Sequence, residues 1–338
     1  MNMIPAPQTS TRTRVRTLIL FALIACGTAN VFAQSLPADD ATRVSEFYRF
    51  AAAVEDKIWS NWSHVPAPLL LITERGEFLT HSGVVPDGFK KIDDEYLYRE
   101  EQFPTNLMAT FPAFGLPSVI IIGEPTTTEA KASTSWIMFA MHEHFHQLQY
   151  AQPHYPAQLQ ALGLSRGEKT GTWIINFPFP YENEAVNAGF DQLRELLLQT
   201  FMEKDGQGFQ DAAARYVRAR KEFMNSLAPD DRTYLEFEIG QEGIARYTQL
   251  SVAEQGASYR PSSQFNALPD YSPFSDIAAH TREQTLNELR HVKLATAKRT
   301  AVYSFGAAEG LLLDRLHPNW KAHYFEHMFA LGPLFEIE

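Results

Sequence analysis

Apolar residues recur with a helical period over most of the second half of the chain. From Ser133 onward this spacing predicts a short terminal helix after Pro318 and six longer ones, over residues 133–150, 181–204, 208–227, 229–255, 275–298 and 301–316. Near the start, the apolar positions from Val44 to Ile58 predict another helix, which Pro37–Asp40 can cap. Helices therefore dominate the expected fold.

Two short runs of aliphatic residues predict strands, over 69–73 and 119–122, because they are bounded by proline and glycine. Residues 84–117 show no period. Residues 257–273, with three prolines, predict a long loop that is either a cleft wall or a plain connector. We therefore expect an α+β fold, with a small N-terminal α+β part over 34–130 and a mainly helical part over 131–338.

The first 33 residues have the composition of an export signal. Three arginines without any acid precede the apolar run Leu18–Cys26, which is too short to span a bilayer. Small residues before Gln34 predict cleavage after Ala33. A second interpretation is a lipobox that ends at Cys26, which would give the mature chain a lipid anchor. Both place the protein in the periplasm or outside the cell, with no transmembrane span in the mature chain.

The charge balance narrows the possible partners and metals. The chain has 29 Lys and Arg against 40 Asp and Glu, so its net charge is −11, and removing residues 1–33 makes it −14 because three arginines are lost. Nucleic acid is not an expected partner, since phosphate binding requires a basic surface. Cleavage after Ala33 also removes the one cysteine, so histidines and carboxylates would have to bind any metal.

The predicted helix 133–150 contains H-E-x-x-H. His142 and His146 are one helical turn apart on one face, so both imidazoles can reach a single zinc ion. Glu143, next to the first ligand, can take a proton from a zinc-bound water. The preceding stretch 136–141 is almost entirely apolar, so we expect a buried helix whose polar residues need partners.

A catalytic zinc needs a third protein ligand, and Glu242 is the best candidate. Gly240 and Gly243 interrupt a helical pattern at a cost of ~1 kcal/mol each, which predicts close approach of another backbone. Glu238 and Glu242 are also one turn apart and repel each other unless a cation neutralises them. Arg246 is the alternative partner of Glu242, and Glu238 is a candidate partner for a ligand histidine.

Other residues compete for these roles. Glu184, and less favourably Glu182, could replace Glu242 as the third ligand. The segment His323–His327 fits the inverted motif H-x-x-E-H, but few residues follow it, so a polar stretch on a terminal helix is the better interpretation.

The motif H-E-x-x-H, followed by a helix with E-G-x-A-x-Y, resembles the gluzincins, which include the thermolysin-like and aminopeptidase-like zinc peptidases. Residues 303–307 are similar to the Y-x-x-G-A segment of the aminopeptidase-like branch. The resemblance implies a zincin-like catalytic domain that binds zinc through His142, His146 and Glu242. It also implies that Glu143 is the base and that Tyr303 donates a hydrogen bond to the oxyanion.

These observations predict an exported zinc-dependent peptidase that acts on a peptide or protein substrate. Tyr247, on the Glu242 helix, is a second candidate oxyanion donor or a core aromatic residue. The alternative function is a non-catalytic metal-binding or envelope peptide-binding protein with the same fold.

Overall fold

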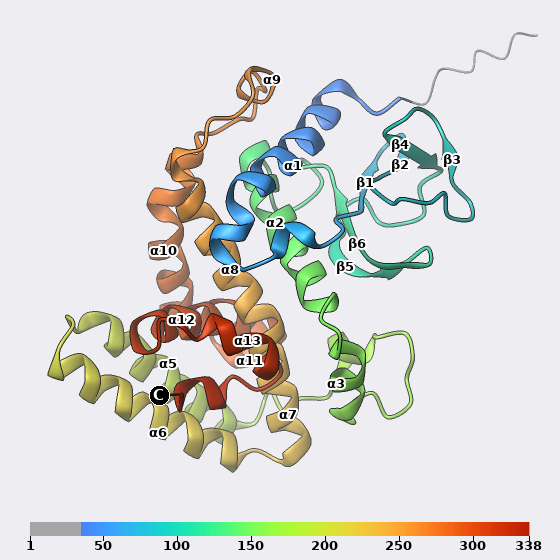
Figure 1. Ribbon diagram of the computed structural model, residues 1–338. Coiled ribbons are helices and arrows are strands. Elements are labelled where there is room, and N and C mark those ends of the chain that lie inside the picture. The colour runs from blue at the N-terminus through green and yellow to red at the C-terminus, as the bar shows by residue number, and fades with distance from the viewer. Residues whose placement is uncertain (1–34, 338) are drawn as a thin grey trace, which may run out of the picture. The chain divides into compact units, whose positions relative to one another are not determined.

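A six-stranded mixed sheet and a set of helices make up the fold (Figure 1). The structure is a computed structural model that describes residues 35–337, so the predicted signal peptide and Cys26 lie outside the described residues. The strands are β1 (Leu69–Thr73), β2 (Gly76–Thr80), β3 (Lys90–Lys91), β4 (Tyr96–Arg99), β5 (Met108–Ala113) and β6 (Leu116–Gly123). Their order in the sheet is β3-β4-β2-β1-β6-β5; only β1 and β6 are parallel.

Helices account for most of the remaining chain. They are α1 (Ala38–Ile58), α2 (Ser133–Tyr150), α3 (Tyr155–Ala161), α4 (Trp173–Asn176), α5 (Glu184–Met202), α6 (Gln207–Ser226), α7 (Pro229–Glu238), α8 (Ile244–Gln255), α9 (Ser263–Asn266), α10 (Phe274–His291), α11 (Leu294–Ala297), α12 (Ala301–Leu316) and α13 (Lys321–His327). One π-helical turn, η2 (Ile239–Gly243), joins α7 to α8, and short 3₁₀ turns are η1 (Trp62–His64), η3 (Gly256–Ser258), η4 (Lys298–Thr300) and η5 (Gly332–Phe335). The expected α+β fold with mainly helical content is confirmed.

The two faces of the sheet pack against different parts of the protein. Alternate residues of β1 and β6, such as Leu71 and Ile120, point into the main core, which the helices share. The other face carries Leu70, Ile72 and Ile121, which form a small separate core under aromatic residues from the loops. Figure 1 shows α2 between the sheet on one side and α8 on the other. The helix with the H-E-x-x-H motif is therefore buried from two sides.

The structure differs from the sequence-based expectations in two segments. Residues 84–117, for which the sequence predicted no element, contain β3, β4 and β5. These short, bulged or partly exposed strands carry no regular alternation, which explains the missing period. The predicted helix 229–255 corresponds to the contiguous run of α7, the π-helical turn η2 and α8, whereas the predicted helix 275–298 ends at His291.

The segment 257–273, which contains the short helix α9, is attached to the body of the protein at several points. The buried Glu46 carboxylate of α1 accepts hydrogen bonds from the Tyr259 hydroxyl and from Ser262. Asp270 accepts a hydrogen bond of 2.6 Å from Ser133 at the first turn of α2. These bonds hold both ends of the segment against α1 and α2.

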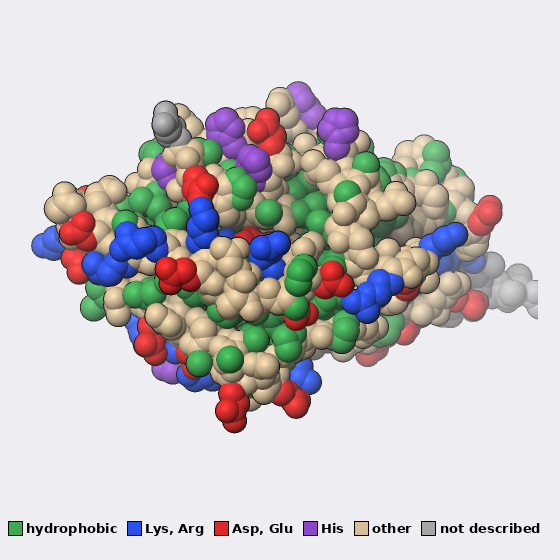
Figure 2. All heavy atoms as spheres, turned by 90° about the horizontal axis from the view of Figure 1, so that it is seen from below, with side chains coloured by type: hydrophobic (Ala, Val, Ile, Leu, Met, Phe, Trp, Pro, Cys, Tyr) green, Lys and Arg blue, Asp and Glu red, His purple; other side chains and the backbone are tan. Residues whose placement is uncertain are grey.

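The surface shows no segregation of charge on the face in Figure 2, where acidic and basic side chains are interspersed. Among the described residues, no helix combines the length and the apolar character that crossing a membrane requires.

Candidate metal centre

Helix α2 positions the two histidines of the motif. Its apolar residues Trp136 and Met141 are fully buried, and the carbonyl of Glu143 accepts a hydrogen bond of 2.9 Å from Thr110 of strand β5. His142 and His146 are each 5% exposed. A helix held on both sides by core packing gives its side chains little freedom, so the two imidazoles are preorganised.

The turn η2 brings Glu242 to the same place. A Cβ at Gly240 would overlap the backbone carbonyl of Met328, and a Cβ at Gly243 would lie 2.6 Å from the Cα of Gly306 in α12. The predicted close approach is thus confirmed at both glycines. The π-helical geometry, which is frequent at functional sites, adds one residue to the turn that carries Glu242.

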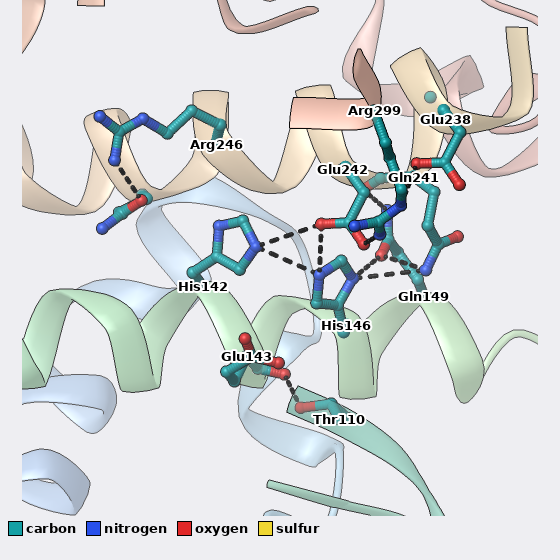
Figure 3. A network of polar contacts seen from close by, with 12 residues as sticks. Thr110, His142, Glu143, His146, Gln149, Glu238, Gln241, Glu242, Arg246 and Arg299 are labelled. Atoms are coloured by element: carbon teal, nitrogen blue, oxygen red, sulfur yellow. Dashed lines mark hydrogen bonds and ion pairs between the residues drawn. The ribbon is translucent and has the colours of Figure 1, made fainter. Parts of the chain in front are cut away.

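His142, His146 and Glu242 converge so that they could bind one metal ion (Figure 3). The two Nε2 atoms are 3.2 Å apart, and Glu242 Oε2 lies 3.6 Å from His142 Nε2 and 3.4 Å from His146 Nε2. Ligands at zinc bond lengths on a tetrahedron are about 3.3 Å apart. The three donor atoms therefore already have the spacing that three ligands of one tetrahedrally coordinated metal ion require.

The charges at this cluster favour an ionised carboxylate. Burial raises the pKa of Glu242, but His146, His142 and Arg299 outweigh this effect and hold the pKa well below its ordinary value. Burial lowers the pKa of His146, but the Glu242 carboxylate raises it to about 9. The site thus holds a carboxylate that attracts a positive charge, either a proton on the imidazole or a metal ion in its place.

A pair of glutamines orients His146. Nδ1 of His146 donates to Gln149 Oε1 at 2.7 Å, which turns Nε2, the other ring nitrogen, toward the cluster. The Gln241 amide donates to the same Gln149 oxygen at 2.9 Å, and Gln149 donates to the Tyr324 hydroxyl at 2.6 Å. Glu238, the expected partner of a ligand histidine, does not have this role. Gln149 is three residues after His146 on the same helix, so the sequence alone could have identified it as a partner of that histidine.

Of the three candidate catalytic residues, Glu143 and Tyr303 lie beside the ligand cluster and Tyr247 does not. Glu143 follows His142 on α2, is 7% exposed, and lies near enough for its charge to raise the pKa of His146. The Tyr303 ring of α12 stacks on His142 with centroids 5.9 Å apart. Burial and then the Glu242 charge raise the pKa of Tyr303 well above its ordinary value, so its hydroxyl remains a donor. Tyr247 lies apart, because its hydroxyl donates to both Asp314 oxygens at 2.9 and 2.8 Å.

The cation near Glu238 and Glu242 is Arg299, which the local sequence pattern did not indicate. Its Nη2 donates to Glu242 Oε1 at 2.5 Å, and its Nε lies 2.9 Å from Glu238 Oε2. Arg246, the partner weighed from the sequence, binds Glu288 instead. Arg299 is four residues before Tyr303, one helical turn away. This spacing from a candidate catalytic residue is the feature of the sequence that could have identified Arg299.

The competing ligand candidates do not join this cluster. Glu184 and Glu182 are exposed at the start of α5, and His323 of the inverted motif is exposed on α13. Among the described residues, the group of potential metal ligands that comes together is His142, His146 and Glu242.

Comparison with known proteins finds no matching family model, no matching curated protein and no matching solved structure.

Proposed function

We propose that this protein is an exported zinc-dependent hydrolase of peptide bonds. One observation carries the proposal: two imidazole nitrogens and one carboxylate oxygen lie at tetrahedral spacing, and a buried glutamate follows the first of these ligands in the chain. Three protein ligands and one open position are the arrangement of catalytic zinc sites, whereas structural sites have four protein ligands.

The donor set fits zinc. Imidazole and carboxylate ligands suit this ion, and no cysteine lies among residues 35–337. When bound, zinc would supply a Lewis acid that polarises a carbonyl and lowers the pKa of a coordinated water to about 7.

Glu143 and Tyr303 would then have separate roles in the reaction. Glu143 would accept a proton from the attacking water and return it to the leaving amine, the two steps of general base and general acid catalysis. Tyr303, stacked on His142, would donate a hydrogen bond to the oxygen on which negative charge develops. Gln149 accepts a hydrogen bond from His146 Nδ1, which directs Nε2 toward the position that the metal would occupy.

A peptide is the substrate class that the surroundings favour. Strand β5 is at the edge of the sheet and touches α2 at the Glu143 carbonyl through Thr110. An extended peptide can pair with the unused backbone groups of an edge strand, which would place its carbonyl groups beside α2.

The deciding experiment is Glu143→Gln. We expect the variant to bind zinc with the stoichiometry of the wild type and to lose about 10²- to 10⁴-fold in kcat, measured by mass spectrometry on a mixed peptide library. The matched control is Tyr247→Phe, which removes a hydroxyl that binds Asp314 and should retain turnover. Zinc binding without peptide hydrolysis by the wild type would instead support the non-catalytic metal-binding alternative.

A further inference from the structure

The Arg299 guanidinium contacts one carboxylate oxygen of Glu238 and one of Glu242, and it does so from the side opposite the histidines. In Figure 3 it lies between Glu238 and Glu242. Its Nη2 donates a hydrogen bond of 2.5 Å to Oε1 of Glu242. Oε2 of the same carboxylate lies 3.6 Å from His142 Nε2 and 3.4 Å from His146 Nε2. The two oxygens of Glu242 therefore have different tasks, and only Oε2 is turned toward the metal site.

The charged group that Glu238 contacts is the Arg299 guanidinium. The Glu238 side chain is fully buried, and neither carboxylate oxygen has an aligned hydrogen bond. The ion pair with Arg299 Nε, at 2.9 Å, is likewise not aligned as a hydrogen bond. A buried carboxylate without hydrogen bonds is costly. Burial raises the pKa of Glu238 to about 8, and the Arg299 guanidinium beside it acts in the opposite direction.

The backbone next to Arg299 is strained. Lys298 has φ 51° and ψ −128°, in the region of positive φ that favours glycine. Such a conformation costs on the order of 1–3 kcal/mol. It lies where α11 ends, so it sets the direction in which the chain enters η4 and α12, the elements that carry Arg299 and Tyr303.

We propose that Arg299 is a positioning residue that occupies one oxygen of Glu242 and so makes this glutamate a one-oxygen ligand, with Glu238 holding the guanidinium in place. The inference rests on the metal site proposed above. A carboxylate that binds through both oxygens would fill the position that a water needs. Arg299 thereby keeps the fourth position open for chemistry.

The test uses Co²⁺ in place of zinc in the full mature chain, because the visible absorption of Co²⁺ reports its coordination number. We expect Arg299→Met to bind Co²⁺ with weaker visible absorption than the wild type, since Glu242 gains a second bond to the ion. We also expect kcat to fall about 10- to 100-fold with little change in KM. Arg246→Met is the matched control, because this arginine lies one turn from Glu242 but binds Glu288, and its spectrum should equal that of the wild type.

A second variant keeps the proposal testable if Arg299→Met does not fold. Arg299→Lys retains the positive charge, but a single ammonium group cannot contact both glutamates as the guanidinium does, so we expect an intermediate Co²⁺ spectrum. Spectra of both folded Arg299 variants identical to the wild type, or of the lysine variant alone if only it folds, would overturn the inference while leaving the metal site intact. If the wild type takes up neither Co²⁺ nor Zn²⁺, the proposed function itself fails.

Discussion

Two arginines, the buried Arg220 and the half-buried Arg299, each lie between two glutamates but have different roles. Arg220 of α6 donates to both oxygens of Glu236 at 2.7 and 2.9 Å and to both oxygens of Glu309 at 2.5 and 3.2 Å. The Tyr216 hydroxyl adds a further hydrogen bond to Glu309. Every carboxylate oxygen in this cluster is thus satisfied from within the protein.

The Arg299 cluster is incomplete by the same measure. Glu242 turns one oxygen away from the guanidinium toward two imidazole nitrogens, and Glu238 has no aligned hydrogen bond. Glu236 and Glu238, two residues apart on α7, therefore belong to different clusters. The comparison indicates that Arg220 ties helices together, whereas the Arg299 cluster leaves a ligand atom unused for an external cation.

The largest expected effect is on the complete cluster. Arg220→Met would leave two buried carboxylates without their cation, and we expect a loss of about 3–5 kcal/mol of unfolding free energy, measured by urea denaturation. Zinc binding by the folded fraction should be unchanged, because this cluster is separate from the metal site. A loss of stability below 1 kcal/mol would contradict the structural role of Arg220.

A smaller effect is expected from adding metal to the incomplete cluster. Zinc at 100 times its Kd should stabilise the wild type by about 2.7 kcal/mol, seen as a rise in Tm that EDTA reverses. His146→Gln should abolish this rise. The matched control is His144→Gln, since His144 binds Glu55 and Gln147 on another side of α2 and should keep the zinc-dependent rise. Equal zinc responses in the two variants would argue against the proposed ligand set.

The smallest effect concerns the strained residue beside Arg299. Lys298→Gly should relieve the positive φ and raise the unfolding free energy by about 1 kcal/mol, measured as a shift in the urea midpoint. Lys298→Ala is the control, because it removes the exposed side chain but retains the Cβ, and it should give no gain. If alanine stabilises as much as glycine, backbone strain is not the cause.

The regular elements and part of the site followed from local pattern. Helices α2 and α12 have the boundaries that their apolar spacing predicts, and β1 matches its aliphatic run. The close approach of another backbone to η2 was predictable because two glycines in a helix need a steric reason. Strands β3 to β5 were not predictable, because their pairing depends on partners elsewhere in the chain.

The sequence by itself determined which helix carries His142 and His146, since their spacing on a buried helix is a local property. It also narrowed the third ligand to Glu242 ahead of Glu184. Only the tertiary structure decided that Arg299, rather than Arg246, faces Glu242, and that Tyr247 turns to Asp314. The physical reason is that electrostatic partners are chosen by distance across packed helices, and residues 57 positions apart meet here through contacts that no local period encodes.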